Sequence, residues 1–524
     1  MVFMKYTGFN RFLSVCVLFA FFAVNIQADK QDAFDKVVRI VKNRGTVYEL
    51  LKEISEQSGY LFIYDSQIID NDKVVKIAKG DCPLRDAIYQ ITGNSQLQME
   101  LSGVYILLRL QKSQKDGNSI LPEVDTGLRE EDTHFTIKGA LYDRQTGEAI
   151  MFASVHILNA STGTVTNQDG VFQLYIPDSL LQSNVRFSHI GYESQEIALP
   201  LLKDRYVGLG MNPQAIALQE VVVTAANPEQ LLKDMLDNRT LNYASEPASM
   251  TLFYREGIDH DDRNIDLTES VLQLYKTGFQ KKTDFDHVKL IKKRRIVSRL
   301  ETDSIFPKIR SGIQSCLVLD VVKEMPDFII PGNDTQYKYA YAGKNYIDDR
   351  PVHVISFQQH ENILEPLYSG VLFIEAENKA LVEVRIEVNP KLVGKATNLY
   401  VSKKPLGLTM NLLQAKYIVS YKPFDNGFYY TNHVRGDISF KIRRRNRLFA
   451  SQLHFWFEMA TCDIDTYHVK AIPPNERLTT SRIFAETKSA YDKNFWEHFN
   501  IILPEEDLKS AISHNLREVL VTGQ

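Results

Sequence analysis

A long series of alternating β-type segments between residues 250 and 460 most constrains what this chain can fold into. In residues 381–388, LVEVRIEV, apolar and charged side chains take turns. Successive side chains of a strand point to opposite faces, so this pattern predicts strands with one buried face. Glu377-Asn378-Lys379 and Asp425-Asn426-Gly427 are hairpin-turn signals between such runs. Many long strands with one apolar face each predict a large curved antiparallel sheet.

Three architectures satisfy that pattern: a sandwich, an open barrel around a helix, and a membrane-spanning barrel. The chain ends in EEDLKSAISHNLREVLVTGQ, which predicts a helix, whereas outer-membrane barrels close with an aromatic-ended strand. Aromatic residues also spread through the strands and do not gather at two girdle levels. The sequence therefore favours a domain outside the bilayer, with the membrane barrel as the alternative.

Two groups of motifs in this region resemble known families. SGVLFIEAENKALVEVRIEV, followed by YKPFDNGFYYTNHVR, resembles the periplasmic lipoprotein-sorting carriers, which are open β-barrels with an apolar cavity. FYRE, SGVLFIEAENKALV and FWEHFNIILPEEDL together resemble a Bacteroidetes group of carboxypeptidase-regulatory-like proteins. The second resemblance covers nearly all of the chain beyond its N-terminal apolar run. It implies an envelope location and no particular activity.

The N-terminus carries a secretory-type signal. Lys5 and Arg11 precede the apolar run RFLSVCVLFAFFAV, which ends near Ala28. A basic start, a short apolar run and a small residue before a polar stretch predict a cleaved signal peptide. The alternative is a membrane anchor, but this run is shorter than the ~20 apolar residues that span a bilayer. Export to an oxidising compartment does not predict disulfides here, because the other cysteines, Cys82, Cys316 and Cys462, are odd in number and widely spaced.

Residues 31–111 contain two successive copies of one strand–helix–strand pattern. The helical stretches are TVYELLKEISEQSG and CPLRDAIYQITG, and Gly59 and Gly93 stand where helices commonly stop. The order and lengths resemble the short N-terminal (STN) domain shared by secretins and TonB-dependent receptors. That resemblance implies a small βα module that docks protein partners. An unrelated βαβ module is the alternative.

Residues 134–211 contain short alternating runs separated by turn signals at Thr146-Gly147, Thr162-Gly163 and Asp169-Gly170. About seven short strands in this length predict a small β-sandwich. GALYDRQTGEAIMFASV, TVTNQDGVFQL and FSHIGYES resemble the carboxypeptidase-regulatory-like domain, a transthyretin-like sandwich. The peptidase activity that this name suggests belongs to a separate metal-binding domain. The resemblance therefore implies a binding or spacer module.

LQEVVVTA, residues 218–225, resembles the segment by which Bacteroidetes TonB-dependent receptors contact their energy-transducing partner. In those receptors a plug and a 22-stranded barrel follow, whereas 300 residues follow Thr224 here. Strands alone would need roughly 220 residues, which leaves too few for a plug and loops. The next stretch predicts an amphipathic helix with Asn227 as N-cap and Pro228 at its first position. The sequence thus excludes a full receptor and leaves a TonB contact open.

Chemistry-bearing motifs are scarce. The twelve histidines form neither His-x-x-Glu nor His-Glu-x-x-His, and the chain has no Gly-x-Ser-x-Gly, phosphate loop or Cys-x-x-Cys. His134, His156 and His189 lie at strand positions and are interpreted as structural. Carboxylates such as Glu269, Asp348 and Asp349 identify no catalytic pair, because separation in space decides that. We expect no catalytic residue, no metal ligand and no cofactor.

Two basic clusters are the candidate site residues, for contact with an anionic surface: Lys292, Lys293, Arg294 and Arg295, and Arg443, Arg444, Arg445 with Arg447. Arginine binds phosphate bidentately, which suits anionic lipid. Solvated strand edges or a hairpin tip are the favoured interpretation, since Lys and Arg discourage edge pairing. The aromatic residues at 428–430 and 455–457 either line a cavity or, as strand aromatics more often do, fill the core. A net charge of −4 and the predicted export disfavour nucleic acid.

The sequence predicts an exported, β-rich, multidomain α+β protein of the periplasm or outer membrane. Its predicted parts are a signal peptide (1–28), an STN-like domain (31–111), a linker (112–133), the sandwich (134–211), a connector with a helix (212–245), an antiparallel domain (246–460) and a helical tail (461–524). The leading function is a non-enzymatic binding or scaffold protein with an envelope protein partner, TonB-related or otherwise. The alternatives are a lipid or lipoprotein carrier, with a lipid or glycan as ligand, and an envelope hydrolase.

Overall fold

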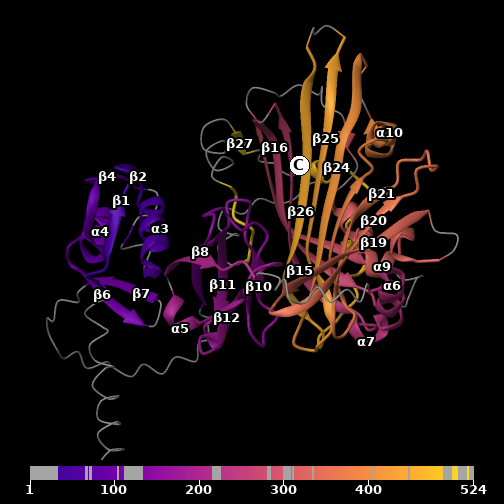
Figure 1. Cartoon of the computed structure of the whole chain (residues 1–524). Coiled ribbons are helices and arrows are strands. Elements are labelled where there is room, and N and C mark those ends of the chain that lie inside the picture. The colour runs from indigo at the N-terminus through magenta and orange to yellow at the C-terminus, as the bar shows by residue number, and fades with distance from the viewer. Residues whose placement is uncertain are drawn as a thin grey trace, which may run out of the picture. The chain divides into compact units, whose positions relative to one another are not determined.

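The computed structural model shows two compact units, which comprise residues 1–131 with 204–210, and residues 132–203 with 211–524 (Figure 1). The structure describes residues 34–64, 69, 73–102, 105–110, 134–203, 205–214, 226–261, 263–279, 285–298, 308–309, 312–332, 336–403, 406–445, 449–487, 499–505 and 516–518. The predicted signal peptide, the linker and LQEVVVTA lie outside these residues. No helix of the described part is both long and apolar enough to cross a membrane.

Two helices organise the first unit. Helix α3 (Val47–Ser58) begins at Thr46, whose side chain and that of Glu49 form a reciprocal capping box, and ends at Gly59 with φ of 76°. Helix α4 (Leu84–Thr92) ends in the same way at Gly93. Both predicted helices are confirmed, and each buries one apolar stripe.

Short strands surround these helices. Strands β1 (Val37–Ile40) and β5 (Gly80–Pro83) pair antiparallel, as do β2 (Arg44–Thr46) with β4 (Val74–Lys76) and β6 (Leu97–Ser102) with β7 (Tyr105–Leu110). Strand β3 (Leu61–Tyr64) runs parallel to β7 and also pairs with the start of β14 (Tyr206–Met211).

The second unit begins with the predicted small sandwich. One layer has the strand order β10 (Gly163–Val165), β9 (Ser154–Ile157), β12 (Asn184–Ser188) and β13 (Gln195–Ala198). The facing layer pairs β8 (His134–Asp143) with β11 (Val171–Pro177). Phe172 and Phe187 meet between the layers with ring centroids 5.4 Å apart. The predicted turns at Gly147 and Gly170 are confirmed, since both have φ of 74°.

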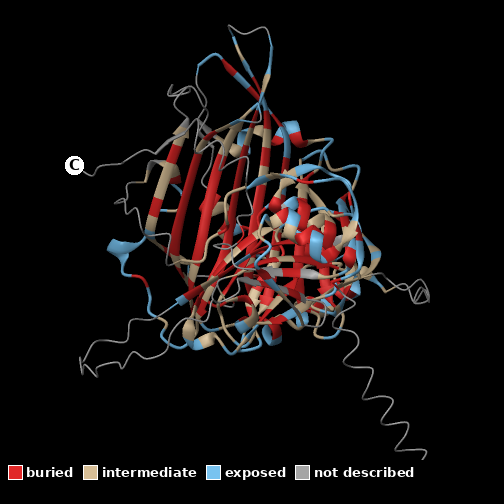
Figure 2. Ribbon diagram, turned by 90° about the vertical axis from the view of Figure 1, so that its left-hand side faces the viewer, coloured by how far each residue is buried: buried red, intermediate tan, exposed pale blue. Residues whose placement is uncertain are grey.

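One antiparallel sheet, with eleven strands among the described residues, forms most of the rest of this unit and confirms the predicted large sheet. Its order is β19 (Tyr337–Ile347), β20 (Arg350–Gln359), β21 (Tyr368–Glu375), β22 (Leu381–Val388), β24 (Leu408–Pro423), β25 (Tyr429–Arg444), β26 (Ser451–Asp465), β15 (Ala248–His260), β16 (Arg263–Lys276), β17 (His287–Ser298) and β27 (Leu516–Glu518). The first hairpin of the domain therefore pairs with its last long strand. Figure 2 shows these strands buried along much of their length.

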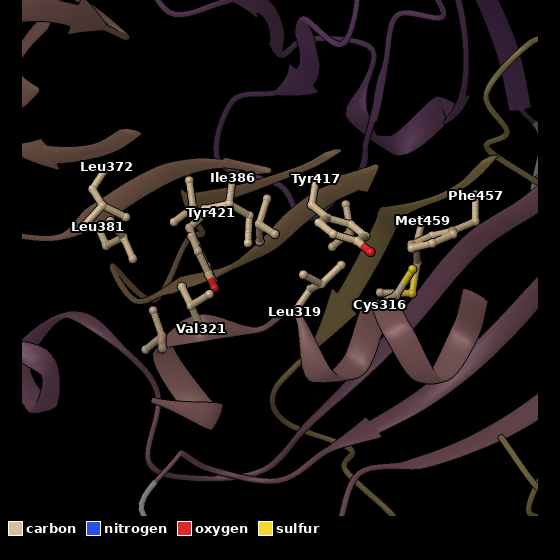
Figure 3. Close-up of a cluster of buried hydrophobic side chains, with 14 of the residues drawn as sticks. Cys316, Leu319, Val321, Leu372, Leu381, Ile386, Tyr417, Tyr421, Phe457 and Met459 are labelled. Atoms are coloured by element: carbon tan, nitrogen blue, oxygen red, sulfur yellow. The ribbon is translucent and has the colours of Figure 1, made fainter. Parts of the chain in front are cut away.

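Helices cover one face of the large sheet, which we call the helix face. They are α6 (Pro228–Asp237), α8 (Gly312–Val318), α9 (Val321–Glu324) and the 3-10 turn η3 (Asp327–Ile329). Cys316, Leu319 and Val321 pack against sheet residues such as Tyr417 and Met459 (Figure 3). The predicted α6 is confirmed: Asn227 caps it, and Leu231, Leu232 and Met235 are buried.

The sandwich packs on the opposite face, which we call the sandwich face. Val165 of β10 joins Phe253, Ala460 and Cys462 in a separate buried cluster. Adjacent residues of these strands therefore pack on opposite faces of the sheet. Phe455 and Phe457 fill the helix-face core, together with Tyr429 and Tyr430, as the core interpretation of these aromatics predicts.

The C-terminal region differs from the predicted helical tail. Strand β26 continues to Asp465, and residues 516–518 form strand β27, paired with the edge of β17. Pairing with an open sheet edge gives these backbone N–H and C=O groups hydrogen-bond partners, which a helix would otherwise provide. Residues 506–515 lie outside the described part. The remaining short elements are α5 (Leu199–Leu202), α7 (Arg239–Asn242), α10 (Thr397–Tyr400), β18 (Lys308–Ile309), β23 (Val401–Lys403), η1 (Asp178–Leu180), η4 (Val393–Ala396), η5 (Pro474–Glu476) and η6 (Phe484–Glu486).

Candidate functional site

A polar cavity of about 430 Å³ lies between the sandwich and the sandwich face of the large sheet. We call it the sandwich cleft. Its charged and imidazole side chains are His156, Arg186, Asp348, Arg350, Lys422 and Asp425. Two cavities among the described residues of the helix face are far smaller, at about 20 and 10 Å³, which is room for about one water molecule each.

Lys422 stands at the centre of the candidate site. Its neighbour in β24, Tyr421, points to the helix face and donates to Asp320 at 3.0 Å, so strand alternation directs Lys422 to the sandwich face. Lys422 is 7% exposed, and its Nζ donates to Ser154 Oγ at 2.9 Å. Burial lowers the pKa of Lys422 to about 7; Asp348 opposes this shift, and Arg186 adds to it.

His156 faces the same cleft from β9. Burial lowers the pKa of its imidazole well below the usual range, and the nearby charges of Lys422 and Arg186 lower it further. The ring is therefore neutral at pH 7. Its Nδ1 atom is buried and has no hydrogen-bond partner among the described residues. A buried polar atom in this state costs free energy unless a ligand or water completes it.

The β19–β20 hairpin supplies the acidic wall. Asp348 and Asp349 have φ of 49° and 60°, as the type I′ turn between Ile347 and Arg350 requires. The Asp349 carboxylate accepts from the backbone N–H of Ser194 at 3.1 Å, which ties the hairpin to the sandwich. One carboxylate oxygen of Asp348 is buried without a partner in the described part.

Both arginines of the cleft have carboxylate partners. Arg350 donates to Tyr429 Oη at 2.8 Å and to Glu375 Oε1 at 3.1 Å, and Arg186 donates through Nε to Glu196 Oε1 at 2.8 Å. Lys422 differs, since no carboxylate of the described residues lies within ion-pair distance of it. The cleft thus contains one buried amine without a carboxylate at ion-pair distance among the described residues, which is the arrangement that an anionic ligand group would complete.

The first predicted basic cluster is distributed over both faces of β17. Lys293 is buried, and its Nζ donates to the carbonyl oxygens of Phe484, Ala485 and Thr487 at 2.7–2.8 Å. Arg294 donates to Glu269 at 2.6 Å, and Arg295 to Asp266 at 3.0 Å. These three side chains therefore have internal partners, and Lys292 is partly exposed. The proposed role of this cluster on an anionic surface stays a prediction.

The second basic cluster lies at the end of β25. Arg443 and Arg445 are exposed, and Arg444 is half-buried. These arginines lie where the hairpin interpretation places them, beside the turn that connects β25 to β26.

A second group of buried charges lies on the sandwich face, on strands β15, β25 and β26. Arg255, Arg435, Glu458, Asp437 and His454 form a connected set of ion pairs there. Each of its charges has an opposite partner, so we interpret this group as structural and not as a ligand site. Among the described residues, no group of three or more His, Cys, Asp or Glu side chains is suited to hold a metal ion.

Sequence reasoning did not single out Lys422 or Arg186. Lys422 occupies a polar position of an alternating strand, which reads as a solvent-facing position until the sandwich is placed over it. Its partner Ser154 is 268 residues away in the chain. The position of this lysine shortly before the Asp-Asn-Gly turn is the only local signal. Lysines at exposed strand ends commonly occupy the same kind of position.

Comparison with solved structures gives distant likenesses. A DUF1329 family protein from Desulfovibrio piger is 12% identical, with 47% of this chain and 96% of that chain covered and a TM-score of 0.24. A putative outer membrane lipoprotein-sorting protein domain from Vibrio parahaemolyticus is 8% identical, with 48% and 96% covered and a TM-score of 0.21. A LolA superfamily protein from Nitrosomonas europaea is 10% identical, with 48% and 97% covered and a TM-score of 0.18. Values this low carry no functional argument.

Comparison by sequence is more specific for one part of the chain. A search of curated proteins found no significant match. The family model of the CarboxypepD_reg-like domain matches residues 137–223. This match covers the sandwich and confirms the carboxypeptidase-regulatory-like prediction for it. The wall of the sandwich cleft that carries Ser154, His156 and Arg186 therefore lies within the segment that matches the CarboxypepD_reg-like family model.

Proposed function

We propose that this protein is an exported, non-enzymatic binding protein that holds an anionic group of its ligand against Lys422 in the sandwich cleft. The observation that carries the proposal is the buried Lys422 amine, whose hydrogen-bond partner is the neutral hydroxyl of Ser154. A buried ammonium without a counter-charge is costly, and a carboxylate or phosphate would remove that cost.

The protonation state of Lys422 suits reversible binding. With a pKa of about 7, the amine is partly neutral when no anion is bound beside it. An anion beside it favours the charged form, so binding would be coupled to proton uptake. Arg186 and Arg350 add positive potential, although each already pairs with a carboxylate.

The cleft favours a small polar ligand group. Its volume of about 430 Å³ is within the range of small-molecule sites. Asn159, Asn432 and Thr461 line it together with the charged residues, and such groups suit the hydroxyls of a sugar. Of the predicted ligand classes, an acidic glycan or the phosphate of a headgroup therefore fits better than an acyl chain.

The envelope setting rests on the sequence. The N-terminal apolar run predicts export, and the module at residues 31–111 resembles domains that dock protein partners. In this proposal that module recruits an envelope protein, TonB-related or otherwise, while the second unit binds the ligand.

A lipid or lipoprotein carrier is the second candidate. It would use the helix face of the large sheet, where α8 and α9 pack on an apolar surface. The two cavities of about 20 and 10 Å³ on that face of the described part are too small for an acyl chain, so this function would require a larger space there. Co-purified phospholipid detected by native mass spectrometry would favour this function.

The test compares Lys422→Met with Lys416→Met, a control on the same strand at an exposed position. Thermal unfolding of the whole secreted chain would be followed with inorganic phosphate and with glucuronate. We expect at least one anion to raise the melting temperature of the parent and the control, and neither to raise that of Lys422→Met. An equal response of Lys422→Met, or no response of the parent, would show that the cleft is not an anion site.

A further inference from the structure

We infer that a second surface, at the end of the hairpin between β25 and β26, docks on an anionic phospholipid membrane. The surface, which we call the hairpin tip, also includes the residues just before β24 and consists of Leu406, Gly407, Lys441, Arg443, Arg444, Arg445 and Phe449. It reaches beyond the rest of the large sheet at the top of Figure 1. The inference is independent of the sandwich cleft.

Backbone pairing holds the parts of the tip together. Leu408 at the start of β24 pairs with Arg444, and Thr409 pairs with Arg443. The backbone N–H of Arg445 donates to the carbonyl oxygen of Gly407 at 2.9 Å. Leu406 and the arginines therefore stay side by side at one end of the sheet.

Three cations gather at the end of β25. Leu408, Met410 and Ile442 point into the helix-face core, so alternation directs Lys441 and Arg443 to the other face, and Arg445 follows the strand in the turn beside Gly407. All three are exposed, and within the described part they form no ion pair. Side chains two residues apart on a strand are ~7 Å apart, which suits separate phosphate groups. Arg294 and Arg295 of the other cluster are, by contrast, already paired.

Two large apolar side chains accompany these cations. Leu406 is fully exposed, and Phe449 is 86% exposed. Most exposed apolar residues stand alone among polar ones, whereas these two lie on the turns that flank the cations. Apolar side chains together with Lys and Arg are typical of surfaces that enter the boundary between headgroups and acyl chains.

The charge of the surrounding chain favours an anionic surface. Residues 401–412 and 440–453 contain seven Lys or Arg and no Asp or Glu, although the whole chain has a net charge of −4. Concentrated positive charge attracts anionic lipid. An acidic protein would offer the same attraction. The exposed position of Leu406 and Phe449 at the end of a projecting hairpin favours insertion into a bilayer instead.

The experiment is vesicle co-sedimentation of the whole secreted chain, with neutral phosphatidylcholine vesicles and with vesicles containing phosphatidylglycerol. One variant carries Arg443→Ser and Arg445→Ser, and another carries Phe449→Ser. Lys338→Ser with Lys391→Ser is the charge-matched control at exposed sites, and Phe285→Ser, at a side chain 78% exposed, is the aromatic control.

We expect the parent to bind the anionic vesicles and to dissociate at high salt. The double arginine variant should bind on the order of tenfold more weakly, since each basic residue near the surface contributes measurably. Phe449→Ser should also weaken binding, and both controls should match the parent. The proposal is overturned if the parent does not bind the anionic vesicles, or if it binds neutral vesicles equally well. It is also overturned if the controls lose as much binding as the tip variants.

Discussion

Arg255 and Glu458 face each other across the pairing of β15 with β26, and both side chains are fully buried. Glu458 also lies 3.5 Å from the Arg435 guanidinium, so one carboxylate serves two guanidinium groups. The Trp456 ring lies near both, at 5.3 Å from Arg255 and 4.9 Å from Arg435. Removal of one partner from a buried ion pair is costly, because it leaves the other charge buried without compensation.

Glu458→Gln should therefore strongly destabilise the second unit. The substitution removes the carboxylate that two buried guanidiniums share. Arg255 keeps Glu505 and Arg435 keeps Asp437, so the cost should lie at the lower end of about 3–5 kcal/mol in the free energy of unfolding. Urea unfolding followed by tryptophan fluorescence measures this change, because Trp456 lies beside both arginines. Glu387→Gln, which removes a partly exposed pair with Lys416, is the control and should cost less than ~1 kcal/mol. Equal effects of the two substitutions would contradict the interpretation of the buried pair.

Lys422 should make stability rise with pH. Burial lowers its folded pKa to about 7, while the unfolded chain keeps an ordinary value. The unfolded state then binds more protons between about pH 7 and ~10.5, so stability increases across that window. Relative to Lys422→Met, the parent should be least stable below pH 7, and its free energy of unfolding should rise steadily above that pH. Denaturant unfolding of both proteins from pH 6 to 10 measures the difference, and a difference independent of pH would refute the buried amine.

Anion binding at the cleft should show the opposite dependence. Protonated Lys422 attracts an anion and neutral Lys422 does not, so affinity should fall as pH rises above about 7. Isothermal titration with the anion that stabilises the parent should give roughly tenfold weaker binding for each pH unit between the pKa of about 7 of the free amine and the higher pKa that the bound anion gives it. Flat affinity between pH 6 and 9 would indicate that another group holds the ligand.

His454 should contribute stability in a different pH window. Against the effect of burial, hydrogen bonds to Asp259 and Asp437 raise the pKa of His454 to about 9. A folded pKa above the unfolded value means that this stabilisation is complete below ~6.5 and is lost as pH rises through about 9. His454→Gln should therefore destabilise most at pH 6 and least near pH 10. Chemical denaturation at those two pH values tests the sign, and a larger effect at pH 10 would contradict it.

Gly170 should not tolerate a side chain. Its φ is 74°, and a Cβ atom would lie 2.4 Å from the carbonyl oxygen of Leu141. Gly170→Ala should destabilise the sandwich by roughly 1–3 kcal/mol, through backbone strain and this overlap. Gly394→Ala, where a Cβ meets nothing within 4 Å, is the matched control. Thermal unfolding compares the two, and equal melting temperatures would be the contrary result.

The large sheet was predictable because its signal is local. Alternation in Leu381–Val388 specifies a strand with one buried face, and Asn227 with Pro228 specifies where α6 begins. Such features depend on residues a few positions apart. Gly59 and Gly93 ended the predicted helices for the same reason.

The sandwich cleft was not predictable, because it depends on which sheet face the sandwich covers. Lys422 and Ser154 meet only through packing of distant segments, and local pattern cannot separate a covered polar face from a solvated one. Residues 516–518 illustrate the same limit: their sequence favours a helix, but an open edge at β17 pairs them as a strand.

The strand order of the large sheet has a consequence for biogenesis. Ser249 of β15 pairs with Asp465 of β26, so the first hairpin cannot join the rest of the sheet until the last long strand is available. Contacts between such distant segments carry a large loop-closure cost and slow folding. A nascent chain of this kind stays without a finished core for most of its synthesis. Translocation machineries that accept only unfolded polypeptides require that condition.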